Sequence, residues 1–239
     1  MSKLQLITLD LDNTLWDVEQ TIRAAERELV SWLKNHAEPA HQVYTSATLI
    51  ELRAQTLEQH PQLRHDLSQL RIEILFNVMR SADYAESEAR DLARAAFDVF
   101  FAGRNRVVFF PGALEMLQTL SERYPIYALT NGNADVTRTG ISHYLQGAIS
   151  SALVGASKPD PSMFHAVLTP SNASPQRCIH IGDHLHDDVQ GASNVGMHSI
   201  WVNLQQSRLN ENDPQPSHEV NHLDEIYAAV LAIEDSLQN

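Results

Sequence analysis

The feature that most constrains the fold is the order in which strand-like and helical segments follow one another. Residues 4–9 form a short apolar run, which is typical of a buried strand. Between residues 18 and 103 apolar residues recur at spacings of three and four, as on one face of a helix, and no strand pattern interrupts them. Beyond residue 112 predicted strands alternate with helices. These later strands span 126–129, 178–181 and 198–202. Strands that are separated by helices predict an α/β fold with a doubly wound parallel sheet.

The long helical stretch divides the chain into two predicted domains. We expect an α/β core domain formed by residues 1–15 and 106–239, and an inserted helical domain formed by residues 16–105. A chain of 239 residues, of which 43% are hydrophobic and 20% charged, is large enough for a globular core with such an insertion. Residues 203–217 are polar and contain two prolines, so we expect a surface loop there.

The charge balance limits the partners. The chain has 17 lysines and arginines against 30 aspartates and glutamates, a net charge of −13 at pH 7. Nucleic acids and anionic membranes are bound by clustered cations, so we expect neither as a partner. The single cysteine, Cys178, cannot form an internal disulfide. The sequence has no apolar run long enough to span a membrane and no leader pattern, so we expect a cytoplasmic protein. We also expect a monomer or a weak dimer.

Two aspartates, Asp10 and Asp12, follow the first predicted strand directly. Open parallel sheets bind their ligands at this end of the strands. Side chains two residues apart on a strand point to the same side, so the two carboxylates would repel each other unless a cation lies between them or one holds a proton. One could then attack an electrophile while the other transfers protons. The alternative is a solvated turn in which the aspartates cap the next helix.

Two further segments could bind an anion. Thr130 follows a predicted strand and precedes Asn131 and Gly132, so its hydroxyl and the neighbouring backbone N–H groups could hold anionic oxygens. A Ser/Thr turn gives the same pattern. Lys158 is one of three lysines in the chain and carries a compact charge that suits the neutralisation of close anions. A surface lysine beside a turn is the alternative.

A fourth polar segment follows the predicted strand at 178–181. Gly182 permits a tight turn there, and Asp183 comes where it can meet Asp10. Asp187 and Asp188 open the following helix, where the helix dipole favours carboxylates, so capping is an alternative explanation for either residue.

These acids would suit magnesium. Mg²⁺ prefers hard oxygen ligands in an octahedron, which Asp10, Asp183 and a carbonyl near Asp12 could supply. Imidazole suits softer ions, so we do not expect a metal site at the three histidines of residues 180–186.

The order of these segments resembles the four motifs of the haloacid dehalogenase superfamily. They are a strand with Asp-x-Asp, a strand with threonine, a Lys-Pro segment, and a strand with Gly-Asp and further acids. The opening Leu-Asp-Leu-Asp-Asn-Thr-Leu of residues 9–15 is a close fit. The helical insertion between the first two motifs is similar to the type-1 cap of that superfamily. The resemblance covers the whole chain and implies a Rossmann-like core with an inserted helical cap.

The resemblance also implies roles for the motif residues. Asp10 would be the nucleophile that forms an aspartyl-phosphate, and Asp12 the acid to the leaving oxygen and then the base to water. Lys158 would steady Asp10 and the phosphate. The groups implied to bind the phosphoryl group are Thr130, Lys158 and the backbone amides around Leu11, Asp12 and Asn131.

A Mg²⁺ ion is implied as cofactor. Its ligands would come from Asp10, the carbonyl of Asp12, Asp183 and a later acid. Family members place that acid four or five residues after the Gly-Asp aspartate. We favour Asp188, since Asp-Val-x-Gly-Ala fits the longer spacing, and keep Asp187 as the alternative.

The implied function is Mg²⁺-dependent hydrolysis of a small phosphorylated metabolite. Halide-removing relatives usually lack the second aspartate, so Asp12 favours a phosphatase over a 2-haloacid dehalogenase. Residues 130–134, Ser-Lys-Pro and Gly-Asp-x-Leu resemble the bacterial flavin mononucleotide phosphatases, which also process the phosphorylated ribitylaminouracil of riboflavin synthesis. Sugar-phosphate, N-acylneuraminate-9-phosphate and nucleotide phosphatases remain alternatives, as does a non-catalytic protein that binds a phosphate ligand. Trp16 could stack on a flavin or base, or pack at the cap hinge.

Overall fold

The chain forms two compact units in the computed structural model, which describes residues 4–237. The core unit extends to Asp17 and resumes at Val108, and the helical unit is Val18–Val107. The domain boundaries that we predicted from the sequence, after residues 15 and 105, lie just before the boundaries in the structure. No helix within the described residues is long and apolar enough to cross a membrane.

The core unit is built on a six-stranded sheet in the order β3-β2-β1-β4-β5-β6, and all neighbouring strands are parallel. The strands are β1 (Leu6–Leu9), β2 (Ile126–Thr130), β3 (Gly147–Ser150), β4 (Cys178–Gly182), β5 (His198–Val202) and β6 (His218–Val220). The predicted doubly wound parallel sheet is confirmed. The strand order reverses at β1, and this is the place where open sheets bind their ligands.

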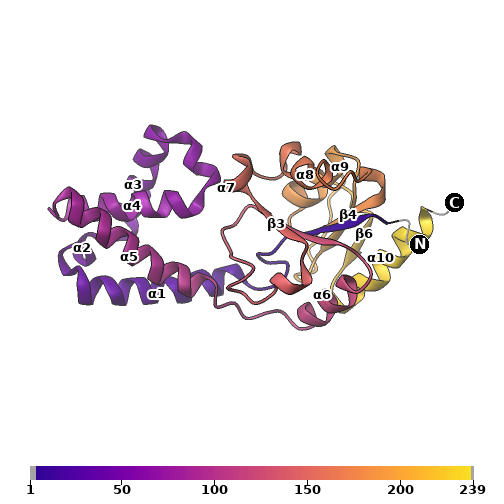
Figure 1. Cartoon of the computed structure of the whole chain (residues 1–239), viewed down its shortest axis with the longest axis horizontal. Coiled ribbons are helices and arrows are strands. Elements are labelled where there is room, and N and C mark those ends of the chain that lie inside the picture. Colours follow the sequence, from indigo (N-terminus) through magenta and orange to yellow (C-terminus); the bar gives the residue numbers. More distant parts are fainter. Residues whose placement is uncertain (1–3, 238–239) are drawn as a thin grey trace. The chain divides into compact units, whose positions relative to one another are not determined.

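Helices cover both faces of this sheet. Helices α8 and α9 lie on one face, and α6 and α10 on the other (Figure 1). The helices of the core unit are α6 (Ala113–Ser121), α7 (Ser151–Val154), α8 (Pro161–Leu168), α9 (Gly191–Asn194) and α10 (Ile226–Ser236). Strand β1 is buried along its whole length, since it lies between β2 and β4 and under both helical layers. Residues that follow β1 therefore emerge at the centre of the sheet.

Strands β3 and β6 were not among the predicted strands. They form the two edges of the sheet. β3 is only partly buried and begins with glycine, and β6 has three residues, so neither carries the apolar run of an inner strand. Their place is set by pairing with β2 and β5 rather than by their own sequence pattern.

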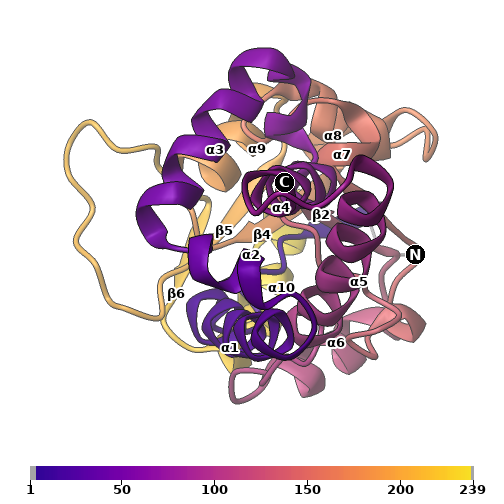
Figure 2. The same cartoon turned by 90° about the vertical axis from the view of Figure 1, so that its left-hand side faces the viewer.

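The helical unit consists of α1 (Val18–His36), α2 (Glu38–Val43), α3 (Ser46–Gln59), α4 (Leu67–Ser81) and α5 (Glu86–Arg104). Helix α5 packs against both α1 and α4 (Figure 2). Gly103 allows the close approach of α5 to α1, since a Cβ there would lie 2.8 Å from the Cα of Ala25.

Candidate active site

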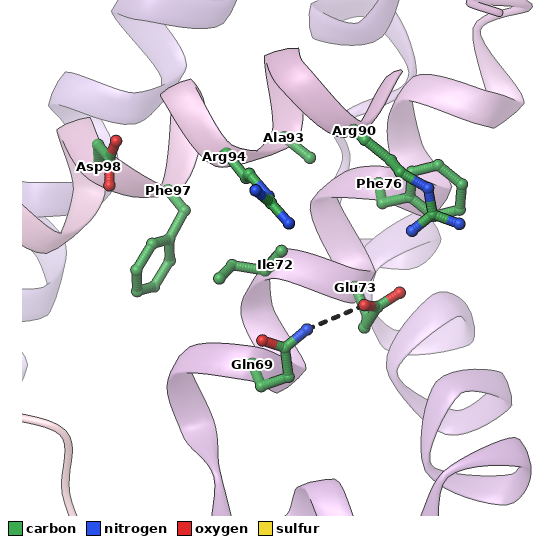
Figure 3. Close-up of a pocket in the computed structure, with 9 residues that line it drawn as sticks. All are labelled: Gln69, Ile72, Glu73, Phe76, Arg90, Ala93, Arg94, Phe97 and Asp98. Atoms are coloured by element: carbon green, nitrogen blue, oxygen red, sulfur yellow. Dashed lines mark hydrogen bonds between the residues drawn. The ribbon is translucent and has the colours of Figure 1, made fainter. Parts of the chain in front are cut away.

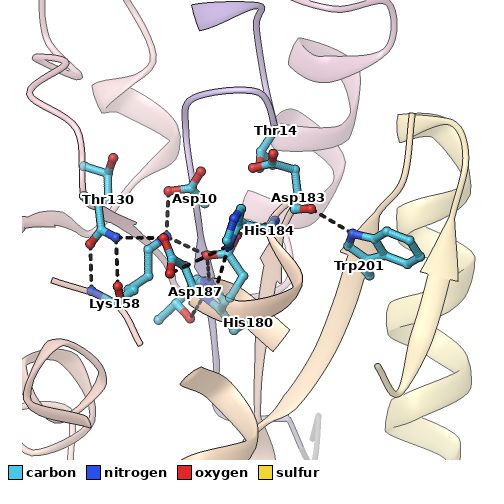
Figure 4. A network of polar contacts seen from close by, with 12 residues as sticks. Asp10, Thr14, Thr130, Lys158, His180, Asp183, His184, Asp187 and Trp201 are labelled. Carbon is cyan, nitrogen blue, oxygen red and sulfur yellow. Dashed lines mark hydrogen bonds and ion pairs between the residues drawn. The ribbon is translucent and has the colours of Figure 1, made fainter. Parts of the chain in front are cut away.

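The polar residues of the predicted motifs meet at the carboxyl ends of three neighbouring strands. Asp10 directly follows β1, Thr130 ends β2, and Asp183 directly follows β4. The backbone N–H of Asp10 still donates to the carbonyl of Ile181 (2.9 Å), so the β1–β4 pairing holds the nucleophile candidate in place. Figure 4 shows these side chains in one polar network.

Lys158 connects two of the carboxylates. Its Nζ donates to Oδ1 of Asp10 (2.6 Å) and to Oδ1 of Asp188 (2.7 Å), and the residue is 4% exposed. Burial acts to lower the pKa of the Lys158 ammonium, but the two carboxylates outweigh this effect and raise it. Lys158 is therefore a buried permanent cation, not the surface lysine of the alternative interpretation.

The side chain of Asn131 holds the backbone of Lys158. Its Oδ1 accepts from the N–H of Lys158 (2.7 Å), and its Nδ2 donates to the carbonyl of the same residue (3.0 Å). Asn131 was predicted to bind the phosphoryl group through its backbone amide. The structure gives its side chain a different task, which is to position the lysine.

Among the described residues, one group of metal-ligating side chains is found, formed by Asp10, Asp183 and Asp188. One carboxylate oxygen of each lies within 4.8 Å of those of the other two. Asp183 is oriented by Thr14, whose Oγ1 donates to its Oδ1 (3.3 Å), and by Trp201, whose Nε1 donates to its carbonyl (2.7 Å). Three carboxylates around one ammonium carry an excess of negative charge that a divalent cation would balance.

The pKa values of this group fit a cation site. Burial raises the pKa of Asp10 well above its usual value despite the opposing effect of Lys158. Burial, together with the charge of Asp188, raises the pKa of Asp183 to about 6. Without a cation the site therefore disfavours full ionisation. Hard carboxylate oxygens at this spacing suit Mg²⁺.

Asp188, rather than Asp187, belongs to this group. Burial alone would raise the pKa of Asp188, but Lys158 and a hydrogen bond from His180 outweigh burial and hold it below the usual value. Its Oδ2 accepts from the backbone N–H of His184 (2.9 Å). Asp187 is more exposed and contacts Nδ1 of His186 (3.1 Å).

The local backbone explains how Asp188 reaches the site. The expected helix start at Asp187 and Asp188 is instead a π-helical turn, Leu185–Gln190, which continues into α9. A Cβ on Gly182 would lie 2.3 Å from Cγ of Asp188. The glycine is thus required by the close approach of a carboxylate, rather than by the tight turn that we expected.

Two residues under the site were not predicted. Thr8 and His180 are direct cross-strand partners in β1 and β4, and both are fully buried. Nε2 of His180 lies 2.9 Å from Oδ1 of Asp188, and Nδ1 lies 2.7 Å from Oγ1 of Thr8. A carboxylate only accepts, so Nε2 carries the proton. Burial lowers the pKa of His180 despite Asp188, so the ring is neutral and Nδ1 accepts from the Thr8 hydroxyl.

The other histidines near the site do not join it. The side chains of His184 and His186 are 61% and 67% exposed, and neither belongs to the metal-ligating group.

The orientation of Asp12 is set by the loop after β1 rather than by strand alternation. β1 ends at Leu9, so the alternation does not extend to Asp12. Its Oδ1 accepts from Nε1 of Trp16 (2.8 Å), and its side chain lies outside the three-carboxylate group. Trp16 is fully buried and packs edge-on against Phe109, so its ring presents no exposed face on which a ligand could stack.

The geometry of Thr130 fits both a Ser/Thr turn and a hydroxyl that binds an anion. It is 3% exposed, and its Oγ1 accepts from the N–H of Gly132 (2.9 Å), as in a Ser/Thr turn. Because the turn uses the oxygen as an acceptor, the hydroxyl proton can still be donated to an anion. Leu11 lies beside Asp10 with its side chain fully buried, so it could serve a ligand only through its backbone.

A separate hollow of about 350 Å³ lies on the helical unit, between α4 and α5 (Figure 3). Its charged groups balance one another, and Arg90 is already paired with Glu86 (2.9 Å) and placed over the ring of Phe76. The lining residues are Gln69, Ile72, Glu73, Phe76, Arg90, Ala93, Arg94, Phe97 and Asp98. Its lining contains no group of acids that could hold a metal ion, so we place the candidate active site in the core unit.

Comparison with known proteins agrees with this geometry. Residues 4–196 match the family model of haloacid dehalogenase-like hydrolases. The chain is 30% identical over 202 residues to the 5-amino-6-(5-phospho-D-ribitylamino)uracil phosphatase YigB of Escherichia coli, covering 84% of each protein. It is 31% identical over 159 residues to the phosphoserine phosphatase of Thermus thermophilus, covering 63% of this chain and 61% of that one.

A solved structure described as a 2-haloacid dehalogenase from Pseudomonas syringae pv. Tomato is also similar. It superposes with a TM-score of 0.92 at 34% identity, over 96% of this chain and 99% of that chain. The family resemblance predicted from the four motifs is thereby confirmed. The chain belongs to the haloacid dehalogenase-like hydrolases.

Proposed function

We propose that the protein is a Mg²⁺-dependent phosphatase that hydrolyses small phosphomonoesters through an aspartyl-phosphate on Asp10. The observation that carries the proposal is the buried Lys158 between Asp10 and Asp188, with Asp183 completing a three-carboxylate group. Phosphoryl transfer depends mainly on positioning and on neutralisation of charge, and this arrangement serves both.

The proposed reaction has two steps. A carboxylate oxygen of Asp10 attacks phosphorus, the bond from phosphorus to the ester oxygen breaks, and Asp12 gives a proton to the departing oxygen. Asp12 then takes a proton from water, which attacks phosphorus and releases inorganic phosphate from Asp10. Lys158 fixes Asp10 throughout, and Thr130 donates its hydroxyl proton to a phosphoryl oxygen.

The proposed cofactor would be held by the same residues. Asp10, Asp183 and the carbonyl of Asp12 would bind Mg²⁺, and Asp188 would be the later acid of the site. The bound ion would offset the negative charge of the carboxylates and of the phosphate, which is its main contribution in such sites.

A 2-haloacid dehalogenase is the second candidate, since the similar structure from Pseudomonas syringae is described as one. Displacement of halide from carbon needs no proton for the leaving group and brings no phosphate into the site. Asp10 could still attack the carbon, but the proton transfer by Asp12 and the capacity of the three-carboxylate group to hold a cation would then have no task. These acids favour the phosphatase.

The proposed substrate class is the phosphorylated intermediate of riboflavin synthesis or flavin mononucleotide. The support is the 30% identity to the Escherichia coli enzyme named for that intermediate. Sugar phosphates, N-acylneuraminate 9-phosphate, nucleotides and phosphoserine are the competing substrates.

The test is a substrate panel with the purified chain. Release of phosphate would be measured for each ester with Mg²⁺ and with EDTA, alongside release of halide from 2-chloropropionate. Phosphate release that requires Mg²⁺ and is lost in Asp10→Asn supports the proposal. Halide release alone supports the dehalogenase, and the absence of both supports a non-catalytic binding protein.

A further inference from the structure

We propose that Trp16 is a positioning residue, whose indole N–H holds the Asp12 carboxyl group in the orientation that protonates the leaving oxygen. The inference rests on the proposed function, because that function makes Asp12 the acid. It assigns a task to a tryptophan that lies outside the three-carboxylate group.

The contact itself suits this task. Nε1 of Trp16 donates to Oδ1 of Asp12 over 2.8 Å, and the tryptophan is fully buried. An indole N–H only donates and does not titrate, so the contact persists whether the carboxyl is ionised or protonated. It therefore fixes the direction of the group without competing for its proton.

The loop backbone brings the two residues together. Asn13 adopts a left-handed conformation (φ of 60°), and its N–H donates to the carbonyl of Trp16 (2.7 Å). The N–H of Leu15 donates to the carbonyl of Leu11 (2.8 Å), which closes the same turn. The chain thus folds back so that residue 16 lies beside residue 12, and the side-chain contact is prepared by the backbone.

The ring is held from a distant part of the sequence as well. Trp16 packs edge-on against Phe109 at a centroid distance of 5.6 Å, and the two residues also form an isolated backbone bridge. The N–H of Phe110 donates to the carbonyl of Leu15 (2.8 Å). The two segments that connect the units therefore anchor the indole inside the core unit, next to the points where the chain leaves and returns.

The consequence differs between substrates. An alkyl phosphate releases a strongly basic alkoxide, which needs a proton as it departs, whereas p-nitrophenolate is stable without one. General acid catalysis contributes about 10²–10⁴ in rate, and part of this is lost when the acid is misplaced. The effect belongs to kcat/KM, which reports the steps up to release of the alcohol and not the hydrolysis of the intermediate that all esters share.

The experiment compares two esters in Trp16→Phe. The first is the alkyl phosphate with the highest turnover in the panel, and the second is p-nitrophenyl phosphate, both with Mg²⁺. We expect the ratio of their kcat/KM values to fall about tenfold in Trp16→Phe. The matched control is Trp32→Phe, which makes the same substitution in α1 of the helical unit and should leave the ratio unchanged.

A second variant guards against misfolding. Phe109→Leu keeps the indole N–H but removes the phenyl ring that packs against the indole. This variant should lower the same ratio by a smaller factor. Equal losses for both esters in these variants, or no loss, would overturn the positioning role while leaving the phosphatase intact. If the wild-type protein hydrolyses neither ester, the proposed function fails and the inference fails with it.

Discussion

The two units bury different kinds of side chain. The core unit buries four ionisable groups that contact one another around the carboxyl ends of β1 and β4, which are Asp10, Lys158, His180 and Asp188. The interior of the helical unit is mainly alanine, leucine and phenylalanine, as at Ala93, Leu29 and Phe100, and Arg104 is the one buried charged side chain among its described residues. Apolar burial stabilises a fold, whereas buried charges are tolerated only when they are paired. The comparison indicates that the core unit is arranged for chemistry and the helical unit for packing.

The polar contacts of the helical unit agree with this view. Glu26 accepts from the hydroxyl of Tyr44 and from Arg71, whose guanidinium also lies 3.6 Å from the ring centroid of Phe100. These groups satisfy one another and leave no excess charge. In the core unit, by contrast, the carboxylates exceed the cations.

The largest expected effect is on catalysis in the core unit. Asp10→Asn removes the proposed nucleophile and should lower kcat by at least ~10³-fold. It also removes a buried acid with a raised pKa, so the melting temperature should be unchanged or higher. Steady-state kinetics and calorimetry check both. A variant with near-normal turnover would break the assignment.

The opposite pattern is expected in the helical unit. Leu29 is fully buried there, and Leu29→Ala should lower the free energy of unfolding by about 2–5 kcal/mol. Well below its melting temperature the variant should hydrolyse p-nitrophenyl phosphate nearly as fast as the wild type. Chemical denaturation and kinetics test this. A loss of turnover as large as that of Asp10→Asn would contradict the contrast.

The pH dependence of stability tests the excess charge. The pKa of Asp183 is about 6 in the folded chain and near 3.8 when unperturbed, so between these values the folded state holds more protons. The free energy of unfolding should then fall as pH rises from 4 to 6, by up to about 3 kcal/mol in EDTA.

Two comparisons isolate this effect from other titrating groups. Asp183→Asn should reduce the slope and leave the part that Asp10 contributes, and Mg²⁺ should oppose the slope by binding the ionised carboxylates. A slope that is the same in the wild type and in Asp183→Asn would show that the pKa of Asp183 is not raised in the folded chain.

The smallest effect is expected beneath the site. Thr8→Val keeps the shape but removes the hydroxyl that donates to Nδ1 of His180. The free energy of unfolding should fall by about 1–3 kcal/mol, because a buried acceptor loses its partner. NMR of the imidazole nitrogens should show the proton on Nε2 in the wild type. A proton on Nδ1 would contradict the assigned tautomer.

The sequence predicts some of these features much better than others. We could predict that Asp10, Thr130 and Asp183 lie close together, because each comes at the carboxyl end of a strand and parallel strands end at the same edge of the sheet. The edge strands could not be predicted, since three or four partly buried residues carry no clear period. The Thr8–His180 pair depends on the register between two strand residues that are 172 positions apart along the chain. The turn from Asp12 to Trp16 depends on a single left-handed residue, Asn13, which spacing alone does not reveal.

The most direct test of the central claim is a search for the phosphorylated enzyme. Asp12→Asn would be mixed with p-nitrophenyl phosphate and Mg²⁺, quenched in acid, digested with pepsin and analysed by mass spectrometry. This ester needs no proton from residue 12, whereas hydrolysis of the intermediate lacks its base, so the intermediate should accumulate. We predict one added phosphoryl group on the peptide that contains Asp10. Release of p-nitrophenol with no phosphoryl group on that peptide would contradict the account.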